Sequence, residues 1–143
     1  MNATASGKSQ RPDLATTVAA PRILAVDDQG DYLDALAELL ASEGYDVATS
    51  ASVVAAVRMA REFNPDLVIT DLNMRPCDGV DFLRMLGQEY RLSSVPRIIL
   101  SSAPEDVVRE RMRAGHVAAE ILDKNGDIGA LLAAIDRLCR ARV

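Results

Sequence analysis

The chain has few aromatic residues and few cysteines for its length. Its 143 residues include three tyrosines, two phenylalanines, two cysteines and no tryptophan. The core must therefore be built mainly from Ala, Val, Leu and Ile. Cys77 and Cys139 lie far apart and fit no metal-ligand spacing, so the sequence indicates reduced thiols of a cytosolic protein rather than a zinc site. A disulfide bridge between them remains an alternative.

The chain also lacks an excess of basic charge. It has 16 Lys and Arg residues against 21 Asp and Glu residues, with a net charge of −5. This balance argues against a nucleic-acid-binding surface, which needs a basic patch to neutralise phosphates. No apolar run approaches the length of a membrane span, so we expect no membrane insertion. His116 is the single histidine, and we expect a surface or partly buried residue rather than a ligand.

Residues 1–21 lack the apolar segment of a secretory signal and are rich in Ala, Ser and Thr. They predict a flexible N-terminal tail, with an interaction arm as the alternative. Residues 22–143 then form one domain, which is long enough to bury a core without disulfides.

The rest of the chain alternates short apolar runs with segments of helical period. Five such βα units predict an α/β fold, a doubly wound five-stranded parallel sheet with helices on both faces. The continuous Ile, Leu and Val runs are typical of strands that are buried on both faces. The predicted strands are 23–26, 45–49, 67–70, 97–100 and 117–122.

Polar side chains stand where the predicted strands end. Because the carboxyl ends of parallel strands meet at one edge, these side chains should converge. Any one of them alone has an ordinary interpretation, such as a turn or a solvated surface residue. Their joint placement indicates a single site. The converging residues are Asp27, Asp28, Asp71, Ser101 and Lys124.

The acidic members of this group predict a metal site. Three clustered carboxylates would repel one another unless a cation lay among them. An oxygen-only site suits Mg²⁺. We expect Asp27, Asp28 and Asp71 to bind Mg²⁺, with the backbone carbonyl of Asn73 as a further ligand.

The other members predict phosphoryl chemistry. Asp71 is placed as a carboxylate nucleophile that could become an aspartyl phosphate. Lys124 would neutralise one phosphoryl oxygen, and the Ser101 hydroxyl would donate a hydrogen bond to another.

Helix capping is the competing explanation for several of these residues. Asp27 and Asp28 could cap the first helix, since Asp is a favoured N-cap residue. We expect Asp78, with Gly79, to cap the third helix and Ser102 to cap the fourth.

Four motifs in order resemble the response regulator receiver domain of bacterial two-component signalling. "ILAVDD" resembles the strand with the acidic pair, and "DLVITDLNMRPCDG" the phosphoacceptor strand and loop. "PRIILSSA" resembles the strand with the hydroxyl, and "ILDK" the strand that ends in lysine. The resemblance covers Arg22 to the C-terminus. It implies the flavodoxin-like strand order 2-1-3-4-5.

The resemblance also implies a mechanism. A histidine kinase or histidine phosphotransfer protein would donate a phosphoryl group to Asp71 with Mg²⁺ as cofactor. The chain would catalyse its own phosphorylation and dephosphorylation rather than act as an enzyme on a separate substrate. A surface of the fourth helix, fifth strand and fifth helix would bind a downstream protein partner in the cytoplasm. A homodimer stays open.

Three positions depart from the family pattern. Arg75 follows Met74 where the family usually has proline, and Asn125 follows Lys124 where proline is common. Ile121 stands where the family often has a switch aromatic. The phosphoryl chemistry is therefore expected to be intact, while its relay to the output surface is expected to differ.

Two other functions compete with a phosphoacceptor. A Mg²⁺-dependent phosphohydrolase could also use Asp71 as nucleophile, but Asn73 stands where haloacid dehalogenase-type enzymes have their acid/base aspartate. A receiver-like scaffold that works without phosphorylation would have no need for the full set of groups. Both are weaker interpretations.

Overall fold

Residues 19–141 are described by a computed structural model, in which five strands alternate with five helices. The elements are β1 (Arg22–Val26), α1 (Gly30–Ser42), β2 (Asp46–Ser50), α2 (Val53–Phe63), β3 (Leu67–Asp71), α3 (Gly79–Gly87), β4 (Arg97–Ser101), α4 (Glu105–Gly115), β5 (Glu120–Asp123) and α5 (Ile128–Ala141).

All strand pairs are parallel, and the order across the sheet is β2-β1-β3-β4-β5. The predicted fold class and strand order are confirmed. β3 is the central strand, and each of its five residues is buried, as its unbroken apolar run predicts. β2 and β5 are edge strands, in which Ser50 alone is buried and the other residues are partly buried or exposed.

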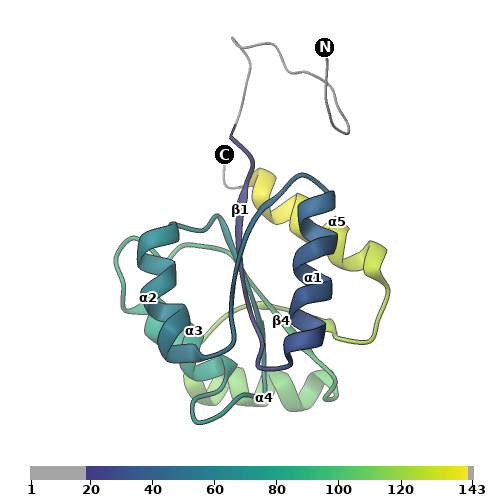
Figure 1. The fold of residues 1–143 in the computed structure, drawn as a ribbon. Coiled ribbons are helices and arrows are strands. Elements are labelled where there is room, and N and C mark those ends of the chain that lie inside the picture. Colours follow the sequence, from purple (N-terminus) through teal and green to yellow (C-terminus); the bar gives the residue numbers. More distant parts are fainter. Residues whose placement is uncertain (1–18, 142–143) are drawn as a thin grey trace, which may run out of the picture.

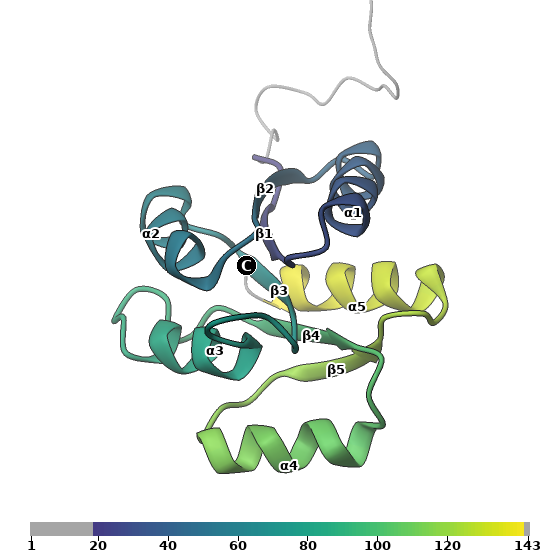
Figure 2. The same ribbon diagram turned by 60° about the horizontal axis from the view of Figure 1, so that its bottom comes forward.

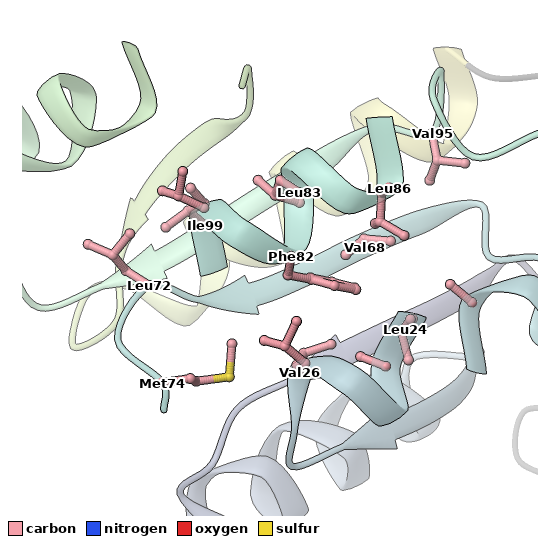
Figure 3. Packing of buried hydrophobic residues seen from close by; sticks show 14 of the residues in the cluster. Leu24, Val26, Val68, Leu72, Met74, Phe82, Leu83, Leu86, Val95 and Ile99 are labelled. Atoms are coloured by element: carbon pink, nitrogen blue, oxygen red, sulfur yellow. The ribbon is translucent and has the colours of Figure 1, made fainter. Parts of the chain in front are cut away.

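Helices cover both faces of the sheet (Figures 1 and 2), and each face carries its own hydrophobic core. Successive side chains on a strand point to opposite faces, so Ile23 packs with α1 and α5, while Leu24 packs with α2, α3 and α4. Figure 3 shows the second of these cores, in which Phe82 of α3 lies near Leu24 and Val68 of the sheet. The two layers hold the strands in place and so position their carboxyl ends.

One strand boundary differs from the sequence-based expectations. The fifth strand begins at Glu120, three residues later than predicted, although it reaches Asp123. Pro21 stands just before β1, and its carbonyl accepts a hydrogen bond of 3.0 Å from the Asp46 backbone. Most of the predicted tail, residues 1–18, lies outside the described residues.

Cys77 packs against the core of α2, α3 and α4, whereas Cys139 is buried in the core of α1 and α5. The two thiols therefore lie on opposite faces of the sheet and form no disulfide with each other. Across residues 19–141, no helix combines the length and the apolar character that a transbilayer span requires.

Candidate functional site

The acidic pair follows β1 directly. Asp27 is 2% exposed, and its Oδ1 accepts a hydrogen bond of 2.9 Å from the Gln29 backbone. Asp28, by contrast, is exposed. Gln29 takes the N-cap position of α1 and makes no side-chain cap, so neither aspartate caps this helix. The acidic pair is thus not explained by helix capping.

Asp71 is the last residue of β3 and is 8% exposed. The Thr70 hydroxyl donates a hydrogen bond of 2.9 Å to the Asp71 carbonyl. Gly79 lies against the same carbonyl, because a Cβ at this position would stand 2.2 Å from the Asp71 oxygen. The loop after β3 therefore returns closely over the strand end, which only a glycine allows here.

Asp27, Asp28 and Asp71 form one acidic cluster, with one oxygen from each within 4.8 Å of the others. Burial, and after it the charge of Asp27, raises the pKa of Asp71 above its ordinary value, and Lys124 opposes this only in part. Within residues 19–141, the buried Oδ2 of Asp27 accepts no hydrogen bond of normal geometry, although it forms an ion pair with Lys124. Crowded hard oxygens with excess negative charge fit a divalent cation such as Mg²⁺.

Lys124 follows β5 and brings its ammonium to this cluster. Its Nζ lies 2.7 Å from Asp27 Oδ2 and 3.3 Å from Asp71 Oδ1; both carboxylates are buried, and the lysine side chain is 9% exposed. Burial lowers the pKa of Lys124, but its close contact with Asp27 and the charge of Asp71 outweigh this and leave the pKa raised. The lysine is therefore a fixed positive charge at neutral pH.

Two neutral side chains from the start of α1 complete the surroundings of this lysine. Gln29 Oε1 lies 2.5 Å from Lys124 Nζ. The ring of Tyr32 lies with its centroid 4.5 Å from the same nitrogen. Neither residue was among the sequence-predicted site residues.

Ser101 ends β4 and is 2% exposed. Its Oγ accepts a hydrogen bond of 3.0 Å from the Ala103 backbone, and its carbonyl accepts one of 2.9 Å from the Lys124 backbone. The backbone bond joins the ends of β4 and β5, so it fixes Ser101 and Lys124 at the same edge of the sheet.

The prediction that Ser102 caps the fourth helix is wrong. α4 has Pro104 at its N-cap position without a side-chain cap. The Ser102 hydroxyl instead accepts a hydrogen bond of 3.2 Å from the Asn125 side chain. α4 begins at Glu105, so Ser102 lies two residues before the N-cap position, and its hydroxyl contacts the loop after β5 instead.

Asp78 caps α3, as predicted. Its Oδ1 accepts from the Asp81 backbone at 2.9 Å, and the Asp81 side chain accepts from the Asp78 backbone at 3.0 Å, a complete capping box. The second oxygen of Asp78 forms an ion pair with Arg111 of α4.

Arg111 also donates a hydrogen bond of 3.0 Å to the Asn73 side chain. It therefore connects α4 to both ends of the segment from Asn73 to Asp78, the loop that follows Asp71. Asn73 itself is exposed, and its backbone carbonyl remains a predicted ligand.

Ile121, which stands at the position of the usual switch aromatic, is partly buried in β5. It packs against the core that contains Val108 and Met112 of α4. The position thus faces α4, the helix that Arg111 links to the loop after Asp71.

The sequence contained a weak signal for some of the unpredicted site residues. Gln29 and Tyr32 follow the acidic pair within one helical turn, and this short separation places the start of α1 near the site. Arg111 is 33 residues from Asp78 in sequence, and no local pattern connects the two.

The chain matches a known family and curated relatives. The response regulator receiver domain model matches residues 23–136. The transcriptional regulatory protein PrrA of Mycobacterium tuberculosis is 36% identical over 129 residues, which are 89% of this chain and 53% of PrrA. The chain therefore spans about half the length of this curated relative.

Solved structures share the fold. The chemotaxis protein CheY4 of Vibrio cholerae aligns with a TM-score of 0.78 and 25% identity, over 84% of this chain and 99% of that chain. The receiver domain of the sensor histidine kinase PA1611 of Pseudomonas aeruginosa, described with a magnesium ion coordinated in its active site cleft, aligns with a TM-score of 0.77 and 24% identity. That alignment covers 85% of this chain and 99% of the PA1611 domain.

The family match covers most of the chain, the strand order is that of a receiver, and the acidic cluster lies at the edge of the sheet where the family motifs end. This chain belongs to the response regulator receiver domain family of two-component signalling.

Proposed function

We propose that Asp71 is the phosphoacceptor of this receiver and that a histidine kinase or a histidine phosphotransfer protein is its donor. One observation carries the proposal: a buried carboxylate ends the central strand, among two further carboxylates and one ammonium. A carboxylate with a raised pKa that is held in such a cluster is typical of a functional site rather than of a structural ion pair.

The reaction transfers one phosphoryl group. An Asp71 oxygen forms a bond to phosphorus, the bond from phosphorus to the donor nitrogen breaks, and the donor histidine keeps the electron pair. Lys124 holds positive charge beside one phosphoryl oxygen as the phosphoryl group moves from the donor nitrogen to the Asp71 oxygen, and the Ser101 hydroxyl donates a hydrogen bond to another phosphoryl oxygen. The same groups would position water for loss of the phosphoryl group, so the chain catalyses its own phosphorylation and dephosphorylation.

The acidic cluster is the proposed Mg²⁺ site. Asp27, Asp28 and Asp71 would supply carboxylate oxygens, and the backbone carbonyl of Asn73 would supply a further one. When bound, Mg²⁺ neutralises phosphoryl oxygens and offsets the repulsion among the carboxylates. Binding should raise the thermal midpoint of the phosphate-free protein, because a ligand of the native state stabilises it. Asp28→Asn should weaken this shift, whereas Glu62→Gln, a change at an exposed acid of α2, should leave it unchanged.

Output would go through a protein partner that binds the surface of α4, β5 and α5. The chain spans about half the length of PrrA, so the partners of PrrA are not assigned to this chain. Phosphorylation adds charge near Ser101 and Lys124. Ser101 lies shortly before α4 in the chain, and Lys124 directly follows β5. Because kinase and receiver meet inside the cell, the proposed location is the cytoplasm.

Incubation of the 143-residue chain with acetyl phosphate and Mg²⁺, followed by intact-mass measurement, tests the proposal. We expect one phosphoryl group per chain, with none in EDTA and none in Asp71→Asn. Continuous release of phosphate from small phosphate esters would support the phosphohydrolase instead. No labelling with acetyl phosphate, and no stabilisation by beryllofluoride with Mg²⁺, would support the phosphorylation-independent scaffold.

A further inference from the structure

The Lys124 ammonium is surrounded by side chains from two other parts of the chain. An ammonium has three N–H donors. The oxygens nearest to it are Gln29 Oε1 at 2.5 Å, Asp27 Oδ2 at 2.7 Å and Asp71 Oδ1 at 3.3 Å. The ring of Tyr32 lies 4.5 Å away. The ammonium therefore contacts two carboxylates, one amide oxygen and one aromatic ring.

The charged groups alone would not hold the lysine in place for the reaction. Asp27 is the nearer carboxylate, and it competes with Asp71 for the ammonium. Gln29 and Tyr32 contact the same nitrogen without adding negative charge to the acidic cluster. They can thus restrict where the ammonium lies and still leave its charge available to a phosphoryl group.

The ring of Tyr32 is suited to this task. The face of an aromatic ring attracts a cation, and the attraction is larger where water is excluded. The Lys124 side chain is 9% exposed. Burial raises the pKa of the Tyr32 hydroxyl above its ordinary value, so the ring is neutral at physiological pH. This aromatic ring at the site stands out in a chain with three tyrosines and two phenylalanines.

Both residues come from the start of α1, which fixes them relative to the acidic pair. Gln29 is the N-cap residue, and its carbonyl accepts a hydrogen bond of 2.9 Å from the Leu33 backbone. Its side chain makes no cap and turns to Lys124 instead. Tyr32 follows three residues later, on the same side of the helix start.

We propose that Tyr32 and Gln29 are positioning residues, which hold the Lys124 ammonium beside Asp71 for phosphoryl transfer. The inference rests on the proposed function. Neither residue contacts the phosphoryl group, and both act through Lys124.

Phosphorylation rates of four single variants test this role, with acetyl phosphate and saturating Mg²⁺. Tyr32→Leu removes the ring, and we expect transfer to slow about tenfold. Tyr32→Phe keeps the ring face and loses only the hydroxyl, so its rate should stay within about twofold of wild type. Gln29→Leu removes the acceptor, and we expect transfer to slow about threefold.

Tyr45→Leu is the matched control. Tyr45 packs partly buried against the same core of α1 and α5 as Tyr32, and Lys124 is not among the groups that influence its hydroxyl. Both leucine variants lose a similar aromatic packing surface, but only Tyr32→Leu should slow transfer. Equal slowing in both would assign the effect to packing and would overturn the inference.

A second measurement does not depend on phosphorylation. In the NMR spectrum, the ring current of Tyr32 should shift the ε-methylene protons of Lys124 upfield in wild type and in Tyr32→Phe. The shift should vanish in Tyr32→Leu and persist in Tyr45→Leu. A rate and an ε-methylene shift that are both unchanged in Tyr32→Leu would overturn the inference.

Failure of the proposed function looks different. In that case neither the wild type nor any variant would take up a phosphoryl group, and the positioning role would be refuted together with the proposed function. Failure of the inference alone would show a wild type that labels normally and a Tyr32→Leu variant that labels just as fast.

Discussion

Lys124 Nζ lies closer to Asp27 Oδ2, at 2.7 Å, than to Asp71 Oδ1, at 3.3 Å. The lysine thus contacts two carboxylates. We expect both Asp27 and Asp71 to bind the metal, and Asp71 to accept the phosphoryl group as well. Its closer partner is the more deeply buried of the two, since Asp27 is 2% exposed and Asp71 is 8% exposed.

Removal of the lysine charge should therefore destabilise the protein as well as slow transfer. Lys124→Met leaves Asp27 buried without its cation, and we expect the free energy of unfolding to fall by about 3 kcal/mol in EDTA. Urea denaturation measures this loss. The double variant Asp27→Asn with Lys124→Met should recover part of it, since no uncompensated charge remains at residue 27. An unchanged denaturation midpoint in Lys124→Met would contradict the ion pair.

Asp71 should reduce the stability of the metal-free protein when it ionises. Burial, followed by the charge of Asp27, raises its pKa, so the native state keeps this proton to higher pH than the unfolded chain. Stability is therefore lost as the pH rises from the unfolded pKa, about 4, through the raised native pKa. In EDTA at pH 7, Asp71→Asn should be more stable than wild type, by on the order of 1 kcal/mol.

The difference between Asp71→Asn and wild type should shrink as the pH is lowered below about 4, where Asp71 is protonated in both states. Denaturation curves at several pH values measure it. A wild type that is more stable than Asp71→Asn at pH 7 without metal would show that Lys124 outweighs burial and the charge of Asp27.

Gly79 should tolerate no side chain. A Cβ would stand 2.2 Å from the Asp71 carbonyl oxygen, and this backbone atom cannot move without shifting the end of β3. We expect Gly79→Ala to cost about 2 kcal/mol of stability and to slow phosphorylation. Gly87→Ala is the control, because a Cβ there meets nothing within 4 Å. This control should be neutral or slightly stabilising, and a Gly79→Ala variant that behaves like it would refute the close approach.

Arg111 should restrain the loop after Asp71. It contacts the side chains of Asn73 and Asp78, at the two ends of that loop. In Arg111→Ala, we expect the backbone amides of residues 72–75, 77 and 78 to exchange with deuterium about fivefold faster. Arg113→Ala removes a neighbouring exposed arginine of α4 that pairs only with Glu110 of its own helix among the described residues. Exchange in that loop should stay unchanged in this control.

Most of the fold and the composition of the site followed from local patterns. Continuous apolar runs identify strands buried on both faces, and parallel strands necessarily bring their carboxyl ends to one edge. Asp27, Asp71, Ser101 and Lys124 all stand at such ends, so their convergence was predictable without side-chain detail.

The remaining features depend on contacts between distant residues. Ser102 looked like a helix cap because serine precedes a helix, yet its hydroxyl contacts Asn125, 23 residues away. Arg111 reaches Asn73 across 38 residues, which no spacing rule detects. Tyr32 shows an apolar helical period like its neighbours, and only the tertiary structure shows that its ring lies over Lys124.

The central claim is that Asp71 itself carries the phosphoryl group. Borohydride reduces an acyl phosphate to an alcohol, so it converts a phosphorylated aspartate into homoserine, which peptide mass spectrometry can locate. After treatment with acetyl phosphate and Mg²⁺, we expect homoserine at position 71 and aspartate at positions 27 and 28. Homoserine at position 27 or 28, or at no position in a protein that is shown to take up phosphate, would contradict the account.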